Sequence, residues 1–355
     1  MKNIKNIEEN PFKFGSVVSG DFFTDREKET AYVKTILASR NHLVLIAPRR
    51  FGKTSLVQKA AAETGRTVVY LNFDAITSKQ DLAEALLRRV FSLSSVEKFK
   101  HLLRNFRFVP KISMNPINSG VDFEFVPSVD DKILLEDAFD LLEKLGTESN
   151  RLIVIFDEFQ RVVKISEDLS GILRSIMQEQ KHINYILLGS QESMMTDIFE
   201  KKKSPFYHFG TMMTLSKIPR EEFAAFLDSR LPDGLSSDIL DFTDCHPYYT
   251  QKLAFHVWNL LKMGTNQDGV VEAAIEFANQ MHSLDFERLW DGFNNTDRKI
   301  LKALAGDRNL NSINIPASTL NSALKKMTRE GFLLKGNAYR IEDPFFSRWI
   351  FDCTR

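Results

Sequence analysis

The residues with the clearest chemical meaning form one short run, residues 47–54, which reads APRRFGKT. The run matches the phosphate-binding pattern GxxxxGK[ST], except that alanine stands in its first position. In such a loop Gly52 lets backbone amides turn inward, Lys53 neutralises phosphate charge, and the Thr54 hydroxyl holds Mg²⁺. A chance GKT at the start of a helix is the alternative. The preceding apolar strand and the following helix favour a nucleotide site.

Two adjacent acids follow an apolar run later in the chain, where residues 152–158 read LIVIFDE. This is the Walker B arrangement, in which a strand delivers Asp157 and Glu158 at its carboxyl end. We expect Asp157 to act on Mg²⁺ and Glu158 to orient and polarise the water that attacks the γ-phosphate. An acid pair that caps the next helix is the alternative. The upstream loop favours the metal site.

A third polar position ends another apolar run, at Ser190 in the sequence LLGSQ. Its hydroxyl could contact the γ-phosphate or the attacking water, which makes it a catalytic candidate beside Lys53 and Glu158. A serine that follows glycine at the end of a strand is more often the amino cap of the next helix. Both interpretations stay open for Ser190.

Elements of regular structure must position these residues. Short apolar segments at 42–46, 67–73, 151–156 and 183–188 predict strands. Segments with helical spacing alternate with them, at 53–64, 78–105, 130–145 and 169–180. Apolar strands that alternate with helices indicate a parallel sheet covered on both faces. The predicted fold class is therefore α/β, a doubly wound P-loop domain.

The strands disappear after residue 217, where only helical spacing remains. The last part of the chain reads helix, helix and a tight hairpin, the order of a winged helix. We therefore expect an amino-terminal segment, a P-loop domain, an all-α lid and a winged-helix domain, with a β-hairpin inserted in the P-loop domain. Their expected limits are 1–14, 15–217, 218–293 and 294–355, with the hairpin near 109–127.

Composition excludes several classes of protein. The chain has 355 residues, 43% of them hydrophobic, and 47 basic residues balance 47 acidic ones. Bulk charge therefore gives no argument for nucleic-acid binding. No apolar run approaches the roughly 20 residues that span a bilayer. Cys245 and Cys353 lie far apart and indicate neither a disulfide framework nor a zinc site. We expect a cytoplasmic protein without a membrane partner.

With these residues in hand, the chain resembles the archaeal-type ATPases of the STAND/AAA+ group, which are related to origin-recognition ATPases. Five segments carry the resemblance: FTDREKE at 23–29, PRRFGKTSL at 48–56, DEFQ at 157–160, HPYY at 246–249 and DPFFSRW at 343–349. The resemblance implies an ATP-binding and ATP-hydrolysing switch, with ATP and Mg²⁺ as cofactors, that couples its nucleotide state to the winged helix. A homo-oligomer or a protein partner is also expected.

The resemblance also implies which residues contact the nucleotide. In the loop they are Pro48, Arg49, Arg50, Phe51, Gly52, Lys53, Thr54 and Ser55. Arg26 belongs to the segment that lies by the adenine in the family. His246 and Pro247 match a turn that packs against the bound nucleotide and reports its state. From the residues alone, His246 is equally a capping or packing residue at the start of a helix.

Two departures from the family pattern bear on these expectations. Cys245 stands where the GHPYY motif has glycine, and Phe209 stands where many relatives carry an arginine in SPLYGR. The second change leaves no arginine finger at that position. Arg49, Arg50, Arg161 or an arginine from another subunit could compensate, so hydrolysis is less firmly expected than nucleotide binding.

The winged-helix segment raises the question of DNA. Residues 294–355 hold eleven basic residues against six acids, an excess of five. Lys325, Lys326 and Arg329 fall on the outer side of its second helix, the one that enters the major groove in winged helices. A solvated helix face, a protein-docking surface or an autoinhibitory lid are the alternatives.

Two other functions remain in view. The first is a DNA-binding regulator or mobile-element factor for which ATP is mainly a structural ligand. The second is a phosphotransferase for a small acceptor. The phosphotransferase lacks an acceptor-binding motif and leaves the helical and winged-helix parts without a purpose.

Overall fold

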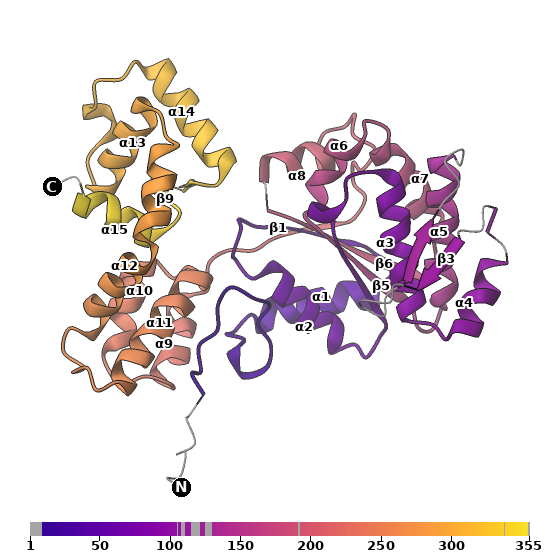
Figure 1. Cartoon of the computed structure of the whole chain (residues 1–355), viewed down its shortest axis with the longest axis horizontal. Helices are drawn as coiled ribbons and strands as arrows, with labels where there is room; N and C mark the ends of the chain where they lie inside the picture. Colours follow the sequence, from indigo (N-terminus) through magenta and orange to yellow (C-terminus); the bar gives the residue numbers. More distant parts are fainter. Residues whose placement is uncertain are drawn as a thin grey trace, which may run out of the picture. The chain divides into compact units, whose positions relative to one another are not determined.

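The computed structural model describes residues 9–104, 106–107, 111–114, 121–124, 130–190, 192–336 and 338–353. The chain forms two compact units (Figure 1). The sheet unit comprises Glu27–Pro48 and Leu56–Leu215. The helical unit comprises the amino-terminal segment as far as Arg26, the loop Arg49–Ser55, and the chain from Ser216 onward. The domain limits expected at 217 and 293 stay predictions.

A five-stranded parallel sheet forms the centre of the sheet unit, with strand order β2-β5-β6-β1-β7. Its strands are β1 Leu43–Ile46, β2 Val68–Asn72, β5 Leu152–Asp157, β6 Ile183–Gly189 and β7 Thr211–Thr214. The predicted α/β class is confirmed. The sequence did not predict the edge strand β7, because its residues are polar or only partly buried and lack a continuous apolar run.

Helices cover both faces of this sheet. They are α1 Glu27–Ala38, α2 Lys53–Ala62, α3 Lys79–Ser92, α4 Val96–Leu103, α5 Asp131–Leu145, α6 Val162–Ile165, α7 Leu169–Glu179 and α8 Glu192–Phe199. In Figure 1, α1 and α2 lie on one side of the sheet, and α3, α5 and α7 on the other. The segment 78–105, expected to be helical, holds two helices, α3 and α4. The chain breaks there because Ser95 caps α4 by accepting a hydrogen bond from the Lys98 amide.

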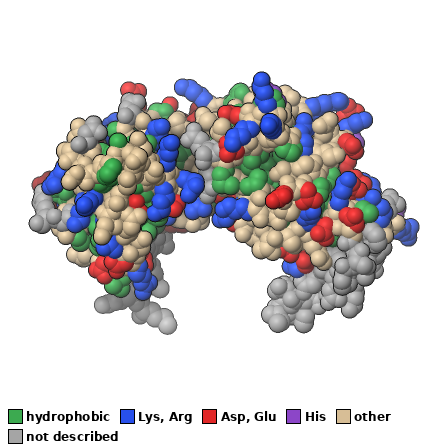
Figure 2. Space-filling model, turned by 90° about the horizontal axis from the view of Figure 1, so that it is seen from above, with side chains coloured by type: hydrophobic (Ala, Val, Ile, Leu, Met, Phe, Trp, Pro, Cys, Tyr) green, Lys and Arg blue, Asp and Glu red, His purple; other side chains and the backbone are tan. Residues whose placement is uncertain are grey.

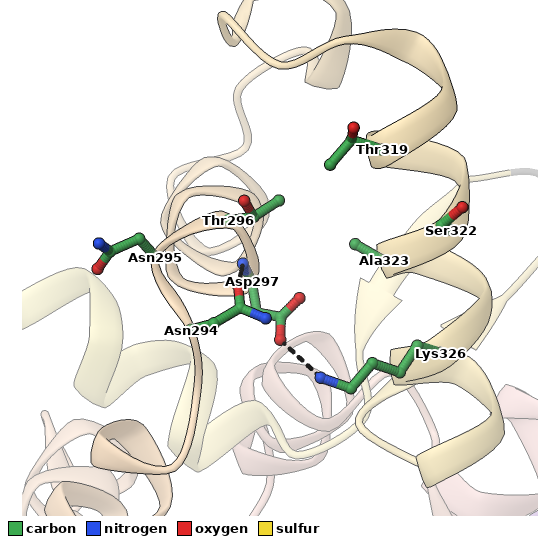
Figure 3. Close-up of a pocket in the computed structure, with 8 residues that line it drawn as sticks. All are labelled: Asn294, Asn295, Thr296, Asp297, Thr319, Ser322, Ala323 and Lys326. Carbon is green, nitrogen blue, oxygen red and sulfur yellow. Dashed lines mark hydrogen bonds and ion pairs between the residues drawn. The ribbon is translucent and has the colours of Figure 1, made fainter.

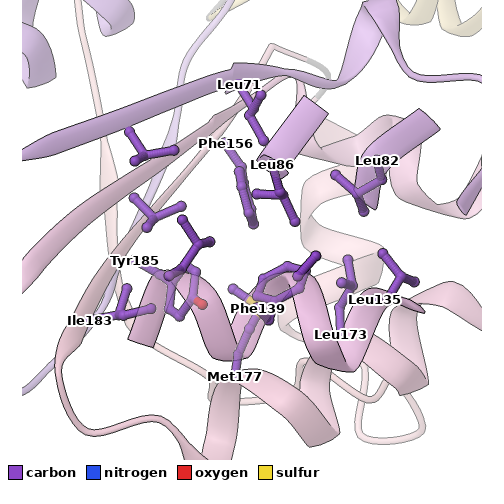
Figure 4. Close-up of a cluster of buried hydrophobic side chains, with 14 of the residues drawn as sticks. Leu71, Leu82, Leu86, Leu135, Phe139, Phe156, Leu173, Met177, Ile183 and Tyr185 are labelled. Carbon is purple, nitrogen blue, oxygen red and sulfur yellow. The ribbon is translucent and has the colours of Figure 1, made fainter. Parts of the chain in front are cut away.

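The core explains why the strands are apolar at every position. All six residues of β5 are buried, because helices cover both faces of the sheet. Val154 and Phe156 point into the cluster under α3, α5 and α7, which Figure 4 shows closing around Phe156 and Phe139. The ring centroids of Phe139 and Phe156 lie 6.2 Å apart, edge to face. The core thereby fixes the strand that ends in Asp157.

An antiparallel pair of short strands, β3 Lys111–Met114 and β4 Val121–Glu124, occurs in the segment expected to form the hairpin near 109–127. Residues 109–110, 115–120 and 125–127 of that segment lie outside the described residues. The described part of the pair has the register Lys111 opposite Glu124 and Met114 opposite Val121.

The helical unit has the predicted order of helices followed by a small hairpin. Its elements are α9 Arg220–Asp228, α10 Leu235–Thr243, α11 Pro247–Lys262, α12 Val270–Asp291, α13 Asn295–Ala305, α14 Ala317–Glu330, β8 Leu333–Lys335, β9 Tyr339–Ile341 and α15 Pro344–Cys353. Helix α12 runs as far as Asp291, and Phe286 in its second half is buried. On α14, Leu324 and Met327 are buried in the core. Among the described residues, no helix is long and apolar enough to cross a membrane.

A buried polar clamp joins β6 to its surroundings and gives a stability test. Asn184 is 0% exposed, and its amide nitrogen donates to the carbonyl oxygens of Ser39 and Asn41 at 3.0 and 2.9 Å. Its Oδ1 accepts a hydrogen bond from Arg66 at 2.5 Å. Asn184→Ala leaves these buried groups unpaired, so we expect a loss of about 2–3 kcal/mol in the free energy of unfolding.

Urea denaturation of the Asn184→Ala variant measures this loss. The exposed Asn266→Ala variant is the control and should stay within about 0.5 kcal/mol of the wild type. An Asn184→Ala variant as stable as this control would mean that the clamp does not hold β6 in place.

Candidate functional site

The phosphate-binding loop has the backbone that anion binding requires. Arg50 and Gly52 have positive φ angles of 64° and 84°, whereas the residue between them does not. Alternating handedness of this kind turns successive backbone N–H groups toward one side, which forms an anion-binding hollow. A side chain at Gly52 would meet open space among the described residues, so the conformation and not crowding favours glycine. Lys53 then begins α2, whose amino end favours an anion.

Several predicted nucleotide contacts are already engaged within the helical unit. Lys53 and Ser55 are buried, and the Ser55 hydroxyl accepts a hydrogen bond from the Val18 amide at 3.0 Å. Arg26 is buried and donates to the Ser216 carbonyl at 2.6 Å. Arg26 therefore ties the amino-terminal segment to the start of the helical part. Its predicted place by an adenine stays a prediction.

Arg50 and Phe51 contact the start of helix α11. The Arg50 guanidinium donates to the Tyr249 hydroxyl at 2.7 Å and lies over the Tyr248 ring at 4.7 Å from its centroid. The Phe51 ring meets the His246 ring edge-on at a centroid distance of 4.8 Å. The loop and the HPYY segment, predicted separately to serve a nucleotide, are thus brought together.

His246 is the amino cap of α11, and Pro247 is the first residue of that helix. The His246 Nδ1 accepts a hydrogen bond from the Tyr248 amide at 3.3 Å. The capping alternative from the sequence therefore holds, and the contact with Phe51 adds to it. Cys245 has a φ of 54°, the left-handed region that favours glycine, which explains why a glycine would fit the same position without strain.

The carboxylate of Asp157 is held by two donors in the sheet unit. Its Oδ2 accepts a hydrogen bond from the Tyr70 hydroxyl at 2.9 Å, and its Oδ1 accepts one from the Glu158 amide at 2.9 Å. Burial and the neighbouring Asp157 raise the pKa of Tyr70, so this hydroxyl stays a donor. Tyr70 was not singled out from the sequence, because only the sheet order shows that β2 lies beside β5.

Glu158 and Ser190 lie together at the carboxyl ends of β5 and β6. The Ser190 hydroxyl donates to Glu158 Oε2 at 2.7 Å. The Gln160 amide donates to the same oxygen and also to Ser190. Glu158 has a φ of 53°, an unusual conformation for a residue other than glycine and one that often marks functional sites. Gln160, part of the DEFQ segment, had no role assigned from the sequence.

Two of the three arginines of this chain that could compensate for Phe209, Arg50 and Arg161, have partners in this structure. Phe209 is buried, and its ring stacks on His42 at a centroid distance of 4.5 Å. Arg161 pairs with Asp74 at 2.6 Å, and Arg50 is bound to Tyr249. Position 209 therefore serves the core of the sheet unit.

Mg²⁺ and a nucleotide fit different parts of the predicted site. The left-handed conformations in the loop suit phosphate oxygens. Thr54 in the loop and Asp157 at the end of β5 each carry an oxygen of the kind that Mg²⁺ prefers. Among the described residues, no group of three or more His, Cys, Asp or Glu side chains forms a separate metal centre. Thr54 and Asp157 stay the predicted magnesium residues.

A hollow of about 520 Å³ lies in the winged helix, between the start of α13 and the face of α14 (Figure 3). Lys326 turns into it and pairs with Asp297 at 3.0 Å. Asp297 is 1% exposed, and its backbone amide donates a hydrogen bond to Oδ1 of Asn294, the amino cap of α13. The pair raises the pKa of Lys326. Lys326 therefore has a carboxylate partner, which differs from the alternative in which the basic residues of this helix form a purely solvated face.

Comparisons with solved structures identify the fold. The Walker-type ATPase PABY2304 of Pyrococcus abyssi matches with a TM-score of 0.66 and 19% identity over 93% of this chain and 96% of that one. The ORC2 protein of Aeropyrum pernix, in ADPNP and ADP complexes, matches with a TM-score of 0.53 and 17% identity over 97% and 99%. The ORC1 protein of the same organism, in complex with DNA, matches with a TM-score of 0.53 and 11% identity over 98% of both chains.

At these identities the matches establish the fold, which is that of AAA+ P-loop ATPases with a carboxyl-terminal winged helix. A search of curated proteins finds no match to the sequence. A family model described as an ATPase domain predominantly from Archaea matches residues 23–253, which include the loop, both acids of the Walker B segment and the HPYY segment. This chain belongs to that family of archaeal-type P-loop ATPases.

Proposed function

We propose that the protein binds ATP with Mg²⁺, hydrolyses it to ADP and phosphate, and uses the nucleotide state as a switch. The observation that carries the proposal is the loop with alternating backbone handedness at Arg50 and Gly52. The held carboxylates at the end of β5 add to it. Family membership supports nucleotide binding.

Each residue has a chemical task in this proposal. The loop amides and Lys53 would bind the phosphates, and Thr54 and Asp157 would hold Mg²⁺, which neutralises charge on the transferred phosphoryl group. Glu158 would accept a hydrogen bond from the attacking water and take its proton. The Ser190 and Gln160 donors occupy one Glu158 oxygen, which orients the carboxylate and leaves the other oxygen to act on water.

Phosphate release from ATP by the purified chain, with and without Mg²⁺, tests the proposal. We expect turnover that requires Mg²⁺. Nucleotide binding without any turnover would contradict hydrolysis and favour the structural role of ATP.

A second candidate function is DNA binding through the winged helix, because Lys325 and Arg329 are exposed on α14. On the face in Figure 2, basic side chains lie among acidic and uncharged ones, so a local patch and not bulk charge would carry the contact. A fold neighbour was solved with DNA, although this neighbour is only 11% identical. Lys326 is less available for contact with DNA, because its ammonium group pairs with Asp297.

Neutralising Lys325 and Arg329 to glutamine should weaken retention of duplex DNA, and the salt dependence of binding should fall by about two phosphate contacts. Fluorescence anisotropy at several salt concentrations measures both effects. The matched control is Lys202→Gln with Lys203→Gln, two exposed lysines of the sheet unit. Equal loss in both double variants would contradict a DNA role specific to α14.

A further inference from the structure

A chain of hydrogen bonds links the phosphate-binding loop to the winged helix within the helical unit. Arg50 Nη1 donates to the Tyr249 hydroxyl at 2.7 Å, and this hydroxyl lies 2.6 Å from Glu342 Oε2. Arginine can only donate and a carboxylate can only accept, so the single tyrosine proton must point to Glu342. Charges at both ends make these bonds stronger than neutral ones.

Burial protects this chain. Tyr249 is 0% exposed, and the Glu342 side chain is 13% exposed. Burial and the carboxylates of Asp343 and Glu342 raise the pKa of Tyr249 far above its usual range, so the hydroxyl keeps its proton. A charged pair bridged through a buried hydroxyl is costly to break on one side only, because the remaining groups lose their partners.

A second line of contacts runs from Glu342 through His246 to Phe51, the loop residue after Arg50. His246 Nε2 lies 3.5 Å from Glu342 Oε1, and neither atom has a hydrogen-bond partner among the described residues. Because His246 Nδ1 accepts a hydrogen bond from the Tyr248 amide, Nε2 is the ring nitrogen left to donate, and it faces this carboxylate. The His246 ring then packs against Phe51.

The loop conformation needs such support. Arg50 has a φ of 64°, which is unfavourable for a residue with a side chain and persists only where surrounding contacts over-determine it. The Arg50 side chain contacts the Tyr249 hydroxyl and the rings of Tyr248 and Tyr249. The aromatic pair at the start of α11 therefore holds the residue whose backbone shapes the anion-binding hollow.

Glu342 is fixed to the winged helix. It follows β9, and its amide donates to the Phe332 carbonyl at 2.9 Å, next to β8. The next residue, Asp343, caps α15 by accepting hydrogen bonds from the amides of Phe345 and Phe346. Any displacement of the winged-helix hairpin therefore moves the Glu342 carboxylate.

We infer that Glu342 is a positioning residue for the phosphate-binding loop, acting on Arg50 through Tyr249 and on Phe51 through His246. Nucleotide affinity then depends on whether the winged helix is seated. By linkage, a bound nucleotide seats the winged helix more firmly by the same factor. The inference rests on the proposed nucleotide function and assigns its regulation to residues outside the loop.

The first test measures ATP affinity with Mg²⁺ by calorimetry. Tyr249→Phe keeps the ring and removes both hydrogen bonds, and Glu342→Ala removes the acceptor. We expect each to weaken ATP binding about tenfold, the equivalent of one charge-assisted hydrogen bond. Glu342→Gln keeps an acceptor for Tyr249 and should recover most of the affinity. Glu276→Ala, an exposed acid on α12, is the matched control and should bind like the wild type.

The second test asks whether Tyr249 acts through Arg50. In an Arg50→Ala background, Tyr249→Phe should weaken ATP binding by less than about twofold, because its partner is already gone. A full tenfold effect in both backgrounds would overturn the inference, since the two residues would then act independently. Unfolding midpoints of all variants identify any that fail to fold, in which case Glu342→Gln and Tyr249→Phe decide the matter.

The failure of this inference differs from the failure of the proposed function. If Tyr249→Phe and Glu342→Ala bind ATP like the wild type while Lys53→Ala does not, the positioning role is wrong and the nucleotide site stands. If the wild-type chain binds no ATP, both are wrong.

Discussion

Replacing Lys53 with alanine is expected to weaken ATP binding at least about 100-fold, or about 2.7 kcal/mol. The lysine is buried at the start of α2, beside a loop whose backbone is shaped for phosphate. Removing its charge leaves the β- and γ-phosphates without their main side-chain counterion. Titration with a fluorescent ATP analogue measures the loss.

Lys59→Ala is the matched control for this prediction, because Lys59 lies on the same helix and pairs with Glu63. We expect its affinity to stay within about twofold of the wild type, since surface ion pairs contribute little. Unaltered affinity in the Lys53→Ala variant would mean that any bound nucleotide does not use this loop.

Replacing Glu158 with glutamine is expected to lower the rate of ATP hydrolysis by about 10²–10⁴-fold while ATP affinity changes less than about twofold. Glutamine keeps the size of the side chain and can still accept the Ser190 hydroxyl. It cannot take a proton from water. Single-turnover phosphate release, measured beside equilibrium binding, separates the two effects.

Glu167→Gln provides the control for this substitution, because Glu167 is exposed in the same unit. It should hydrolyse ATP at the wild-type rate. Equal rates for Glu158→Gln and the wild type would remove Glu158 from the catalytic step and leave the acid pair a purely structural role.

The fold, the strand that ends in Asp157 and the backbone of the phosphate-binding loop could be predicted from local sequence patterns. The apolar run before Asp157 requires a strand buried on both faces, and β5 is such a strand. The glycine of the GKT motif predicted an unusual backbone conformation, and Gly52 has it. These features depend on neighbours in the sequence, so composition and spacing suffice to reveal them.

Contacts between distant segments could not be predicted in this way. Arg50 and Tyr249 are 199 residues apart, and no periodicity connects them. The Tyr70 hydroxyl donates a hydrogen bond to Asp157 because β2 lies beside β5, and the sequence pattern does not predict this order of strands. Helical spacing over 78–105 does not show where α3 ends and α4 begins, because the cap that starts α4 is a single residue, Ser95.

Phe209, which departs from the family pattern, was recognised from the sequence, but its role was not. The sequence predicted that no arginine finger stands there. Only the packed structure explains what the phenylalanine does, since it stacks on His42 and supports the Arg174 guanidinium at 4.9 Å. A core aromatic therefore occupies the position where the family pattern predicts a charge.

A crystal structure of the wild-type chain with a non-hydrolysable ATP analogue and Mg²⁺ tests the central claim most directly. The account predicts the triphosphate in the hollow of residues 47–54, with its β-phosphate contacted by loop amides and Lys53. It also predicts Mg²⁺ beside Thr54. An empty loop at saturating analogue, or an analogue bound elsewhere on the chain, would contradict it.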